Sequence, residues 1–235
     1  SPGREKATGQ GVVFCLQHWA DEVGFDLAGA TASLQGFGNV GSAAGRILQV
    51  HGTRVVAVAD HGGAIADEDG IDAFELTDWV REHGSVAGFP RAMWIDPDDY
   101  WAVPADLLLP AALENQITVE NVHQIQARVV VEAANGPTSL EAEQVLADRG
   151  IDVLPDILVN AGGVIVSYFE WLQNRSAQRW SLEDVDFKLR DTLWQACDSV
   201  ADLRAELEVP SRRDAAYAVA LRRLQVVYKQ RGIFP

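Results

Sequence analysis

The stretch that decides the fold of this chain is Gly36-Phe37-Gly38-Asn39-Val40-Gly41, a G-x-G-x-x-G pattern. It follows a short apolar run at residues 30–35 and opens a helical pattern at residues 40–50. A β-branched run at residues 53–59 then predicts a buried strand. Strand, glycine turn, helix and strand in this order predict a βαβ unit that binds a dinucleotide.

Each glycine of this turn has its own physical task in such a site. The first permits a tight turn, the second lets the backbone approach the pyrophosphate, and the third lets helix and strand pack closely. Unpaired N–H groups at the helix N-terminus then bind the anion. We therefore expect the pyrophosphate to lie along the whole turn, at Gly36, Phe37, Gly38, Asn39, Val40 and Gly41.

An acidic residue, Asp60, ends the strand that follows this helix. A carboxylate there accepts hydrogen bonds from the adenosine ribose hydroxyls, which favours NAD because it repels the 2′-phosphate of NADP. Two observations leave alternatives open. Asp60 precedes Gly62 and Gly63 and is also typical of a simple turn, and the neighbouring His61 can accommodate the extra phosphate, so NADP remains possible.

Strand and helix patterns alternate through the first two thirds of the chain and then give way to helices. This predicts an α/β, Rossmann-like doubly wound fold with a mostly parallel sheet and C-terminal helices. We expect a single nucleotide-binding domain over residues 1–235, with its core at about 28–160 and flanking helices at 7–23 and 162–231. Further strands are expected at 105–110, 129–133 and 151–154, helices at 72–83, 120–125, 140–148 (capped by Ser139), 164–172, 182–207 and 212–231, a polar turn at 64–70 and irregular structure at 84–99.

Composition narrows the classes of function. The chain has 235 residues, 48% of them apolar and 23% charged, as in ordinary globular proteins. Its net charge of −15 disfavours nucleic acid and anionic membranes as partners. We see no signal peptide and no apolar run long enough to span a bilayer, so a cytoplasmic location is expected. Cys15 and Cys197 form no disulfide framework, and the scattered histidines predict no metal site.

Four further motifs, at residues 4–11, 109–115, 133–138 and 160–164, are each typical of ordinary turns when taken alone. Three of them follow predicted strands, at the edge where open parallel sheets bind ligands. Together, and in this order, they resemble the second domain of the glutamate/leucine/phenylalanine/valine dehydrogenases. The resemblance runs from Arg4 to about Tyr228, and residues 160–171 look like the glutamate branch.

The resemblance implies a role for each matching residue. Thr8 would contact the nicotinamide carboxamide, and Ala134 and Asn135 would lie along the cofactor, with Asn135 near the nicotinamide ribose. Asn160 would approach the nicotinamide or the amino-acid end of the substrate. Ser167 would hydrogen-bond the γ-carboxylate of glutamate, and Val164 would pack on the substrate's side chain. The resemblance also implies a homo-oligomer, commonly a hexamer, that interconverts L-glutamate and 2-oxoglutarate.

Catalytic groups of the resembled family are missing from this chain. Its three lysines, Lys6, Lys188 and Lys229, do not match the family's glycine-flanked catalytic lysine. We therefore assign no catalytic residue here and expect the N-terminal catalytic and substrate domain to be absent. The chain alone should bind cofactor without turning over glutamate, because it lacks the groups that orient the second reactant and transfer its proton.

Two alternatives remain open at this point. One is a leucine- or phenylalanine-type dehydrogenase, disfavoured by the residues that follow the shared N-A-G-G-V motif. The other is a nucleotide-sensing module without catalysis, which needs the glycine turn but no substrate pocket. We also expect the helix at residues 212–231 to expose an apolar surface and to pack towards the missing domain, acting in hinge closure.

Overall fold

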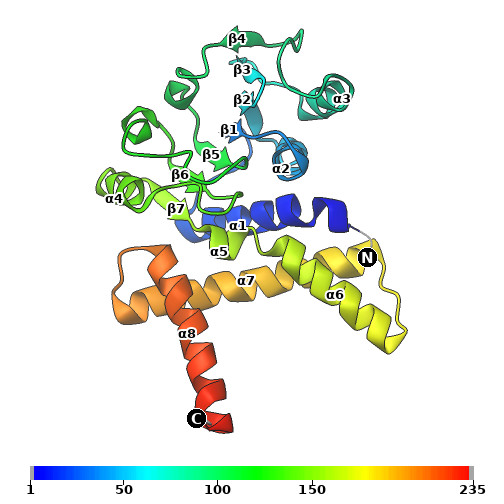
Figure 1. Cartoon of the computed structure of the whole chain (residues 1–235), viewed down its shortest axis with the longest axis vertical. Coiled ribbons are helices and arrows are strands. Elements are labelled where there is room, and N and C mark those ends of the chain that lie inside the picture. The colour runs from blue at the N-terminus through cyan, green and yellow to red at the C-terminus, as the bar shows by residue number, and fades with distance from the viewer. Residues whose placement is uncertain (1–2, 233–235) are drawn as a thin grey trace.

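A computed structural model describes residues 3–232 and contains a seven-stranded sheet (Figure 1). The strands follow the order β4-β3-β2-β1-β5-β6-β7. Their bounds are β1 (Thr31–Gln35), β2 (Arg54–Asp60), β3 (Gly63–Ala66), β4 (Met93–Ile95), β5 (Leu107–Pro110), β6 (Val129–Val131) and β7 (Asp152–Leu154).

Helices cover both faces of this sheet. Figure 1 shows α2 and α3 on one side, α4 on the other, and α1 between the sheet and the helices α6 and α7, while α8 starts beside α7 and runs away from the sheet. Two separate apolar cores lie on the two faces, as a doubly wound fold requires. The helices are η1 (Arg4–Lys6), α1 (Ala7–Val23), α2 (Asn39–Val50), α3 (Ala73–His83), η2 (Tyr100–Ala102), η3 (Val122–Gln124), α4 (Leu140–Asp148), α5 (Asp156–Val159), α6 (Gly162–Ser176), α7 (Leu182–Leu207) and α8 (Arg212–Arg231).

The sheet has its topological switch point between β1 and β5. Both β2 and β5 pair with β1 in parallel, so the chain winds outward from β1 in one direction and later returns to build the other half. Ligands of open α/β sheets bind at the carboxyl ends of the strands that flank such a point. The glycine turn follows β1 at this edge. The parallel pairing of β2, β1, β5, β6 and β7 confirms the α/β fold class and the mostly parallel sheet.

Three local predictions were wrong. Residues 64–70 do not form only a polar turn, because β3 pairs antiparallel with β2 through a tight connection after Asp60. Within residues 84–99, expected to be irregular, β4 extends the sheet antiparallel to β3. Ala64 and Ile65 of β3 are buried in the two cores, which explains why the short strand β3 is stable. The helix expected at 120–125 is only the 3₁₀ turn η3.

The helical predictions were more accurate. The expected bounds at 7–23, 140–148, 182–207 and 212–231 agree with α1, α4, α7 and α8. Ser139 caps α4 as expected, since its hydroxyl accepts a hydrogen bond from the Ala142 N–H at 3.2 Å. Along the described chain, no helix is long and apolar enough to cross a membrane. The apolar surface expected on α8 is also present, at Tyr217, Leu221, Leu224, Val226, Val227 and Tyr228.

Candidate cofactor-binding site

The glycine turn is packed so closely that two of its positions exclude any side chain. Gly36 has φ 96°, donates its N–H to the Ala59 carbonyl at 2.6 Å, and leaves no room for a methyl group against the backbone of Ala111. A methyl group on Gly41 would collide with the carbonyl oxygen of Gly36. These two glycines therefore bring β1, α2 and the end of β5 into direct backbone contact.

Gly38 differs from its neighbours because a methyl group there would point into open space. It is the N-cap of α2 and supplies no side-chain hydrogen bond to the first turn of the helix. The N–H groups of that turn are thus available to an anion. Phe37 is different again: its side chain is 3% exposed and belongs to the apolar core, so only its backbone faces the turn.

The carboxylate of Asp60 already has two backbone partners. Its Oδ1 accepts from the N–H of Gly62 at 2.8 Å and its Oδ2 from the N–H of Val86 at 2.9 Å. Asp60 therefore stabilises the turn that follows β2, and it also connects the end of β2 to the segment after α3. Each carboxylate oxygen has a second lone pair, so the ribose role is compatible with these bonds. The orientation of Asp60 is set before any ligand binds.

Close helix crossings carry residues from distant segments to the edge of the sheet. Gly9 allows α1 to approach α2, because a methyl group there would lie 2.8 Å from the Ala43 Cβ. A methyl group on Gly162 would collide with the Ala7 carbonyl, and one on Gly163 would lie 2.6 Å from the Thr8 hydroxyl. Helix α1 is thereby held against both α2 and α6, and Thr8 faces the beginning of α6.

A hollow of about 820 Å³ opens where these segments meet, and we call it the α6 hollow. The side chain of Asn160 donates from Nδ2 to the Oδ1 of Asn135 at 2.7 Å, which fixes the two amides relative to each other. Seven residues assigned from the sequence line this hollow: Thr8, Val40, Ala134, Asn135, Asn160, Val164 and Ser167. The structure brings together one helix entry, the glycine turn, one strand end and the start of α6.

The two residues expected to touch substrate stand one helical turn apart on α6. Val164 is 76% exposed, which is unusual for valine and leaves its methyl groups free to contact a ligand. Ser167 donates its hydroxyl to the Gly163 carbonyl at 2.8 Å. Since a hydroxyl has one hydrogen, Ser167 must exchange this internal bond before it can donate to a carboxylate.

Sequence reasoning missed part of this lining. The segment after β5 contributes Ala111, Ala112, Leu113 and Glu114 to the α6 hollow, yet no binding role was assigned to it. Its sequence was noted only as a strand end that belongs to the family pattern. The missing signal was the pairing of β5 with β1, which places this segment opposite the glycine turn across the switch point.

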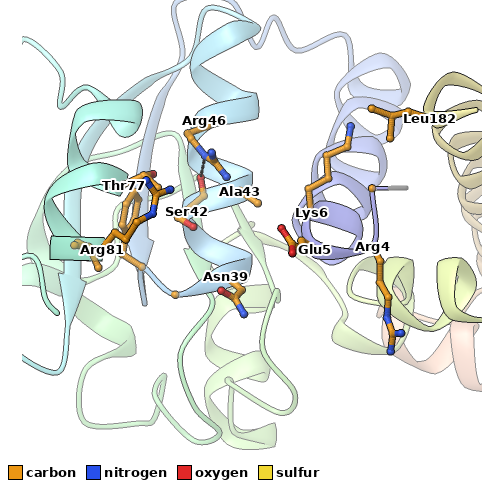
Figure 2. A pocket seen from close by; sticks show the side chains of 14 residues that line it. Arg4, Glu5, Lys6, Asn39, Ser42, Ala43, Arg46, Thr77, Arg81 and Leu182 are labelled. Atoms are coloured by element: carbon orange, nitrogen blue, oxygen red, sulfur yellow. Dashed lines mark hydrogen bonds between the residues drawn. The ribbon is translucent and has the colours of Figure 1, made fainter. Parts of the chain in front are cut away.

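A second hollow, of about 870 Å³, lies on the other side of the glycine turn and was not predicted. Figure 2 shows it between α2 and α3 on one side and η1 on the other, and we call it the basic hollow. The Arg46 Nε donates to the Ser42 carbonyl at 3.2 Å, and Lys6 pairs with Asp186 at 2.7 Å. Its charged lining consists of the cationic side chains of Arg4, Lys6, Arg46 and Arg81 and the carboxylate of Glu5.

This concentration of cations matters because the chain as a whole is strongly acidic. At −15, the overall field opposes the approach of an anionic cofactor. The basic hollow borders Gly38 and Asn39 at the start of α2. Three of these cations already pair with carboxylates, Arg4 with Glu170, Lys6 with Asp186 and Arg81 with Asp78. Arg46 instead donates to the Ser42 carbonyl of its own helix, so it is the cation that adds positive charge beside the turn.

The α6 hollow has little acid–base chemistry of its own. Among its lining residues in the described chain, Glu114 is the one ionisable side chain, and none of the three lysines lines it. The described residues also contain no group of histidine, cysteine, aspartate and glutamate side chains that could hold a metal ion. The arrangement can bind and orient ligands, whereas proton transfer needs further groups.

Comparison with known proteins identifies the family. Residues 1–232 match the family model described as Glutamate/Leucine/Phenylalanine/Valine dehydrogenase. The chain belongs to this family. The assignment drawn from the motif order is thereby confirmed, including its extent over almost the whole chain.

Individual relatives within the family are glutamate dehydrogenases. The chain is 42% identical to the NADP-specific glutamate dehydrogenase A1 of Halobacterium salinarum, over 100% of the chain and 57% of that protein. It is 42% identical to the NAD-specific glutamate dehydrogenase of Clostridioides difficile, over 99% of the chain and 56% of that protein. The chain therefore spans about half the length of the curated relatives that it matches.

The fold of this chain also matches a solved structure of the family. The hetero-hexameric glutamate dehydrogenase of Thermus thermophilus, in its leucine-bound form, superposes with a TM-score of 0.94 at 34% identity. The match covers 100% of this chain and 55% of that one. The sheet order and the C-terminal helices described above are thus the fold of this domain in the family.

Proposed function

We propose that this chain is the nucleotide-binding domain of an NAD(P)-dependent glutamate dehydrogenase. The observation that carries the proposal is the α6 hollow, in which Asn135, Asn160, Val164 and Ser167 lie together beside the glycine turn. A dinucleotide whose pyrophosphate rests on the turn can extend across the switch point into this hollow. Its nicotinamide end would then meet the residues that the family resemblance assigns to substrate.

The residues of this chain bind and orient, and the bound nicotinamide supplies the chemistry by accepting a hydride. Gly38, Asn39 and Val40 would hold the pyrophosphate through backbone N–H groups. Asp60 would accept from the adenosine ribose. Thr8, Ala134, Asn135 and Asn160 would fix the nicotinamide end; the hydrogen bond between the two asparagines supports this, because it holds both amides in place before the cofactor arrives.

Glutamate, rather than leucine or phenylalanine, is the substrate that we infer. Ser167 can donate to a side-chain carboxylate after it releases the Gly163 carbonyl, and the exposed Val164 can pack on the methylene groups. The names of the relatives and residues 160–171 support the same choice. A leucine- or phenylalanine-type enzyme remains the alternative, and a panel of amino acids on the full-length enzyme discriminates between them.

Oxidative deamination also needs a base and a cradle for the α-amino and carboxyl groups. Holding both reactants in attack geometry supplies roughly 7–11 kcal/mol of a reaction barrier. In our proposal these groups come from a first domain, in a longer protein that is cytoplasmic and forms an oligomer, commonly hexameric in this family. The 235-residue chain would then bind cofactor without converting glutamate.

Titration calorimetry of this chain with NADH and NADPH tests the cofactor part. Binding of NADH is expected, with NADH favoured over NADPH because of Asp60. Absence of binding by both nucleotides would contradict the proposal, and a strong preference for NADPH would contradict the role of Asp60. Reduction of NAD by glutamate at an enzyme-like rate with this chain alone would contradict the division of labour between two domains.

A nucleotide-sensing module without catalysis is the competing class of function. It needs the glycine turn but not an exposed valine and a serine beside the nicotinamide end of the site. Their presence on the wall of the α6 hollow favours the dehydrogenase. An open reading frame that extends well upstream of Ser1 would favour it further.

A further inference from the structure

Arg213, in the first turn of α8, contacts three carboxylates from three different elements. Its Nη2 lies 2.5 Å from Glu132 at the end of β6, its Nε lies 2.7 Å from Glu143 of α4, and its Nη1 lies 2.8 Å from Asp156 of α5. The Arg213 side chain is 12% exposed and that of Glu132 is completely buried. One guanidinium therefore holds three carboxylates together inside the domain.

Two of these carboxylates also hold the backbone that leads to Asn135. The Oε2 of Glu132 accepts from the N–H of Asp156 at 2.9 Å. The Oδ2 of Asp156 accepts from the N–H of Gly136 at 2.8 Å. The loop between Glu132 and Gly136 is thus fastened at both ends to the beginning of α5, and both fastenings involve a carboxylate bound by Arg213.

The same short helix positions the second asparagine of the site. Helix α5 begins at Asp156 and ends just before Asn160, whose amide bonds to Asn135 at 2.7 Å. A displacement of Asp156 would therefore move both partners of this amide pair. Arg213 does not line the α6 hollow, and its ion-pair partners are Glu132, Glu143 and Asp156. Any effect of Arg213 on a ligand is therefore transmitted through these carboxylates.

The charge balance makes the arrangement depend on Arg213. Burial raises the pKa of Glu132, and the positive charge of Arg213 opposes this rise. The adjacent Arg212 cannot substitute, because it pairs with Glu22 at 2.9 Å and lies 3.7 Å from Asp152. Without Arg213, the carboxylates of Glu132, Glu143 and Asp156 would repel one another, and the loop and α5 would separate.

We propose that Arg213 is a positioning residue for the nicotinamide end of the cofactor site, acting through Glu132 and Asp156 on Asn135 and Asn160. This inference rests on the proposed cofactor-binding function. It also assigns a task to α8, whose first turn sets the geometry of a pocket that the helix does not touch. The adenosine and pyrophosphate end, built on β1, β2 and α2, is independent of this network.

That independence gives a test within a single protein. ADP carries only the adenosine and pyrophosphate part of the cofactor, whereas NADH also carries the nicotinamide ribose and ring. In Arg213→Met we expect the affinity for NADH to fall about tenfold, the effect of losing one hydrogen bond to a polar group held in place. The affinity for ADP, measured by the same calorimetry, should stay within about twofold.

Arg222→Met is the matched control, since Arg222 lies on the same helix and forms a two-bond pair with Glu206 at the surface. It should change neither affinity. Equal losses of NADH and ADP affinity in Arg213→Met would mean a merely structural role and would overturn the inference. An unchanged NADH affinity would overturn it as well.

A second variant keeps the inference testable if Arg213→Met does not fold. Asp156→Asn leaves Arg213 paired with Glu132 and Glu143, but its amide offers one oxygen where both Gly136 and Arg213 need an acceptor. We expect the same selective loss of NADH affinity, and an unchanged ratio of NADH to ADP affinity would overturn the inference. If the wild-type chain binds neither NADH nor NADPH, the proposed function itself fails, which is a separate result.

Discussion

The two ends of the candidate cofactor site are held in place by different kinds of interaction. At the glycine turn, backbone packs on backbone, and Gly36 and Gly41 are fixed by the absence of side chains. Near the asparagine pair, Arg213 of α8 binds Glu132, Glu143 of α4 and Asp156 of α5 in an ionic network. Steric exclusion at Gly41 acts within the turn and at Gly36 against the backbone of Ala111, whereas the ionic network depends on charged side chains up to 81 residues apart. The two ends should therefore respond differently to mutation and to pH.

The largest effect on stability is expected from Arg213→Met. Removing one partner of a buried ion pair costs about 3–5 kcal/mol, and here it leaves three carboxylates without their cation. Chemical denaturation at neutral pH measures this loss. A change below about 1 kcal/mol would mean that the network is solvated like a surface ion pair.

The loss in Arg213→Met should depend on pH. The pKa of Glu132 is raised from its ordinary value of 4.5 by burial, and without Arg213 it rises further. A carboxyl whose pKa is raised by folding stabilises the fold below its unfolded pKa and loses that contribution as pH rises through the folded pKa. The penalty should therefore be smallest near pH 4.5 and grow towards neutrality, and a penalty that grows on acidification would contradict this origin.

Gly41→Ala tests the end that is built by backbone packing. Its methyl group would collide with the Gly36 carbonyl, and such overpacking costs about 1–3 kcal/mol and displaces the turn. We expect lower stability at every pH together with loss of both ADP and NADH binding. Gly45→Ala on the same helix is the matched control, because its methyl group would meet its neighbours at an ordinary 3.5 Å. It should be neutral or more stable, by up to about 1 kcal/mol.

Gly38→Ala should separate binding from stability. A methyl group there meets no atom of the chain within 4 Å and adopts an ordinary backbone conformation, so stability should change by less than about 0.5 kcal/mol. It would occupy the space that we assign to the pyrophosphate, and we expect about tenfold weaker binding of both ADP and NADH. Unchanged affinity in calorimetry would mean that the pyrophosphate lies elsewhere.

The smallest effect is expected from Ser167→Ala. Its hydroxyl bonds only to its own helix, so stability should change by less than about 0.5 kcal/mol and NADH affinity not at all. In the full-length enzyme, activity with glutamate should fall while activity with an aliphatic amino acid is retained. Steady-state kinetics with both substrates checks this, and an equal loss for both would contradict a contact with the γ-carboxylate.

Many residues of the candidate site could be proposed from the sequence because their signals are local. The glycine turn and Asn135 follow strands, and Asp60 ends one, whose apolar patterns are visible in the sequence. Asn160 was assigned from the family resemblance. The basic hollow was not predictable, because Arg4 and Arg81 come from segments with no shared pattern and line one hollow only because η1 and α3 each pack against α2. The antiparallel strands β3 and β4 were missed because strands of four and three residues are too short to show a period.

The sequence by itself determined the βαβ unit and the family and indicated the candidate ligand-binding residues, because turn chemistry and periodicity act between residues close together in the chain. Only the tertiary structure decided that β5 lies beside β1, that Thr8 meets the start of α6, and that Arg213 gathers Glu132, Glu143 and Asp156. These contacts join distant segments, and each depends on how whole elements pack. An arginine at the start of a helix looks the same in sequence whether it faces solvent or three buried carboxylates.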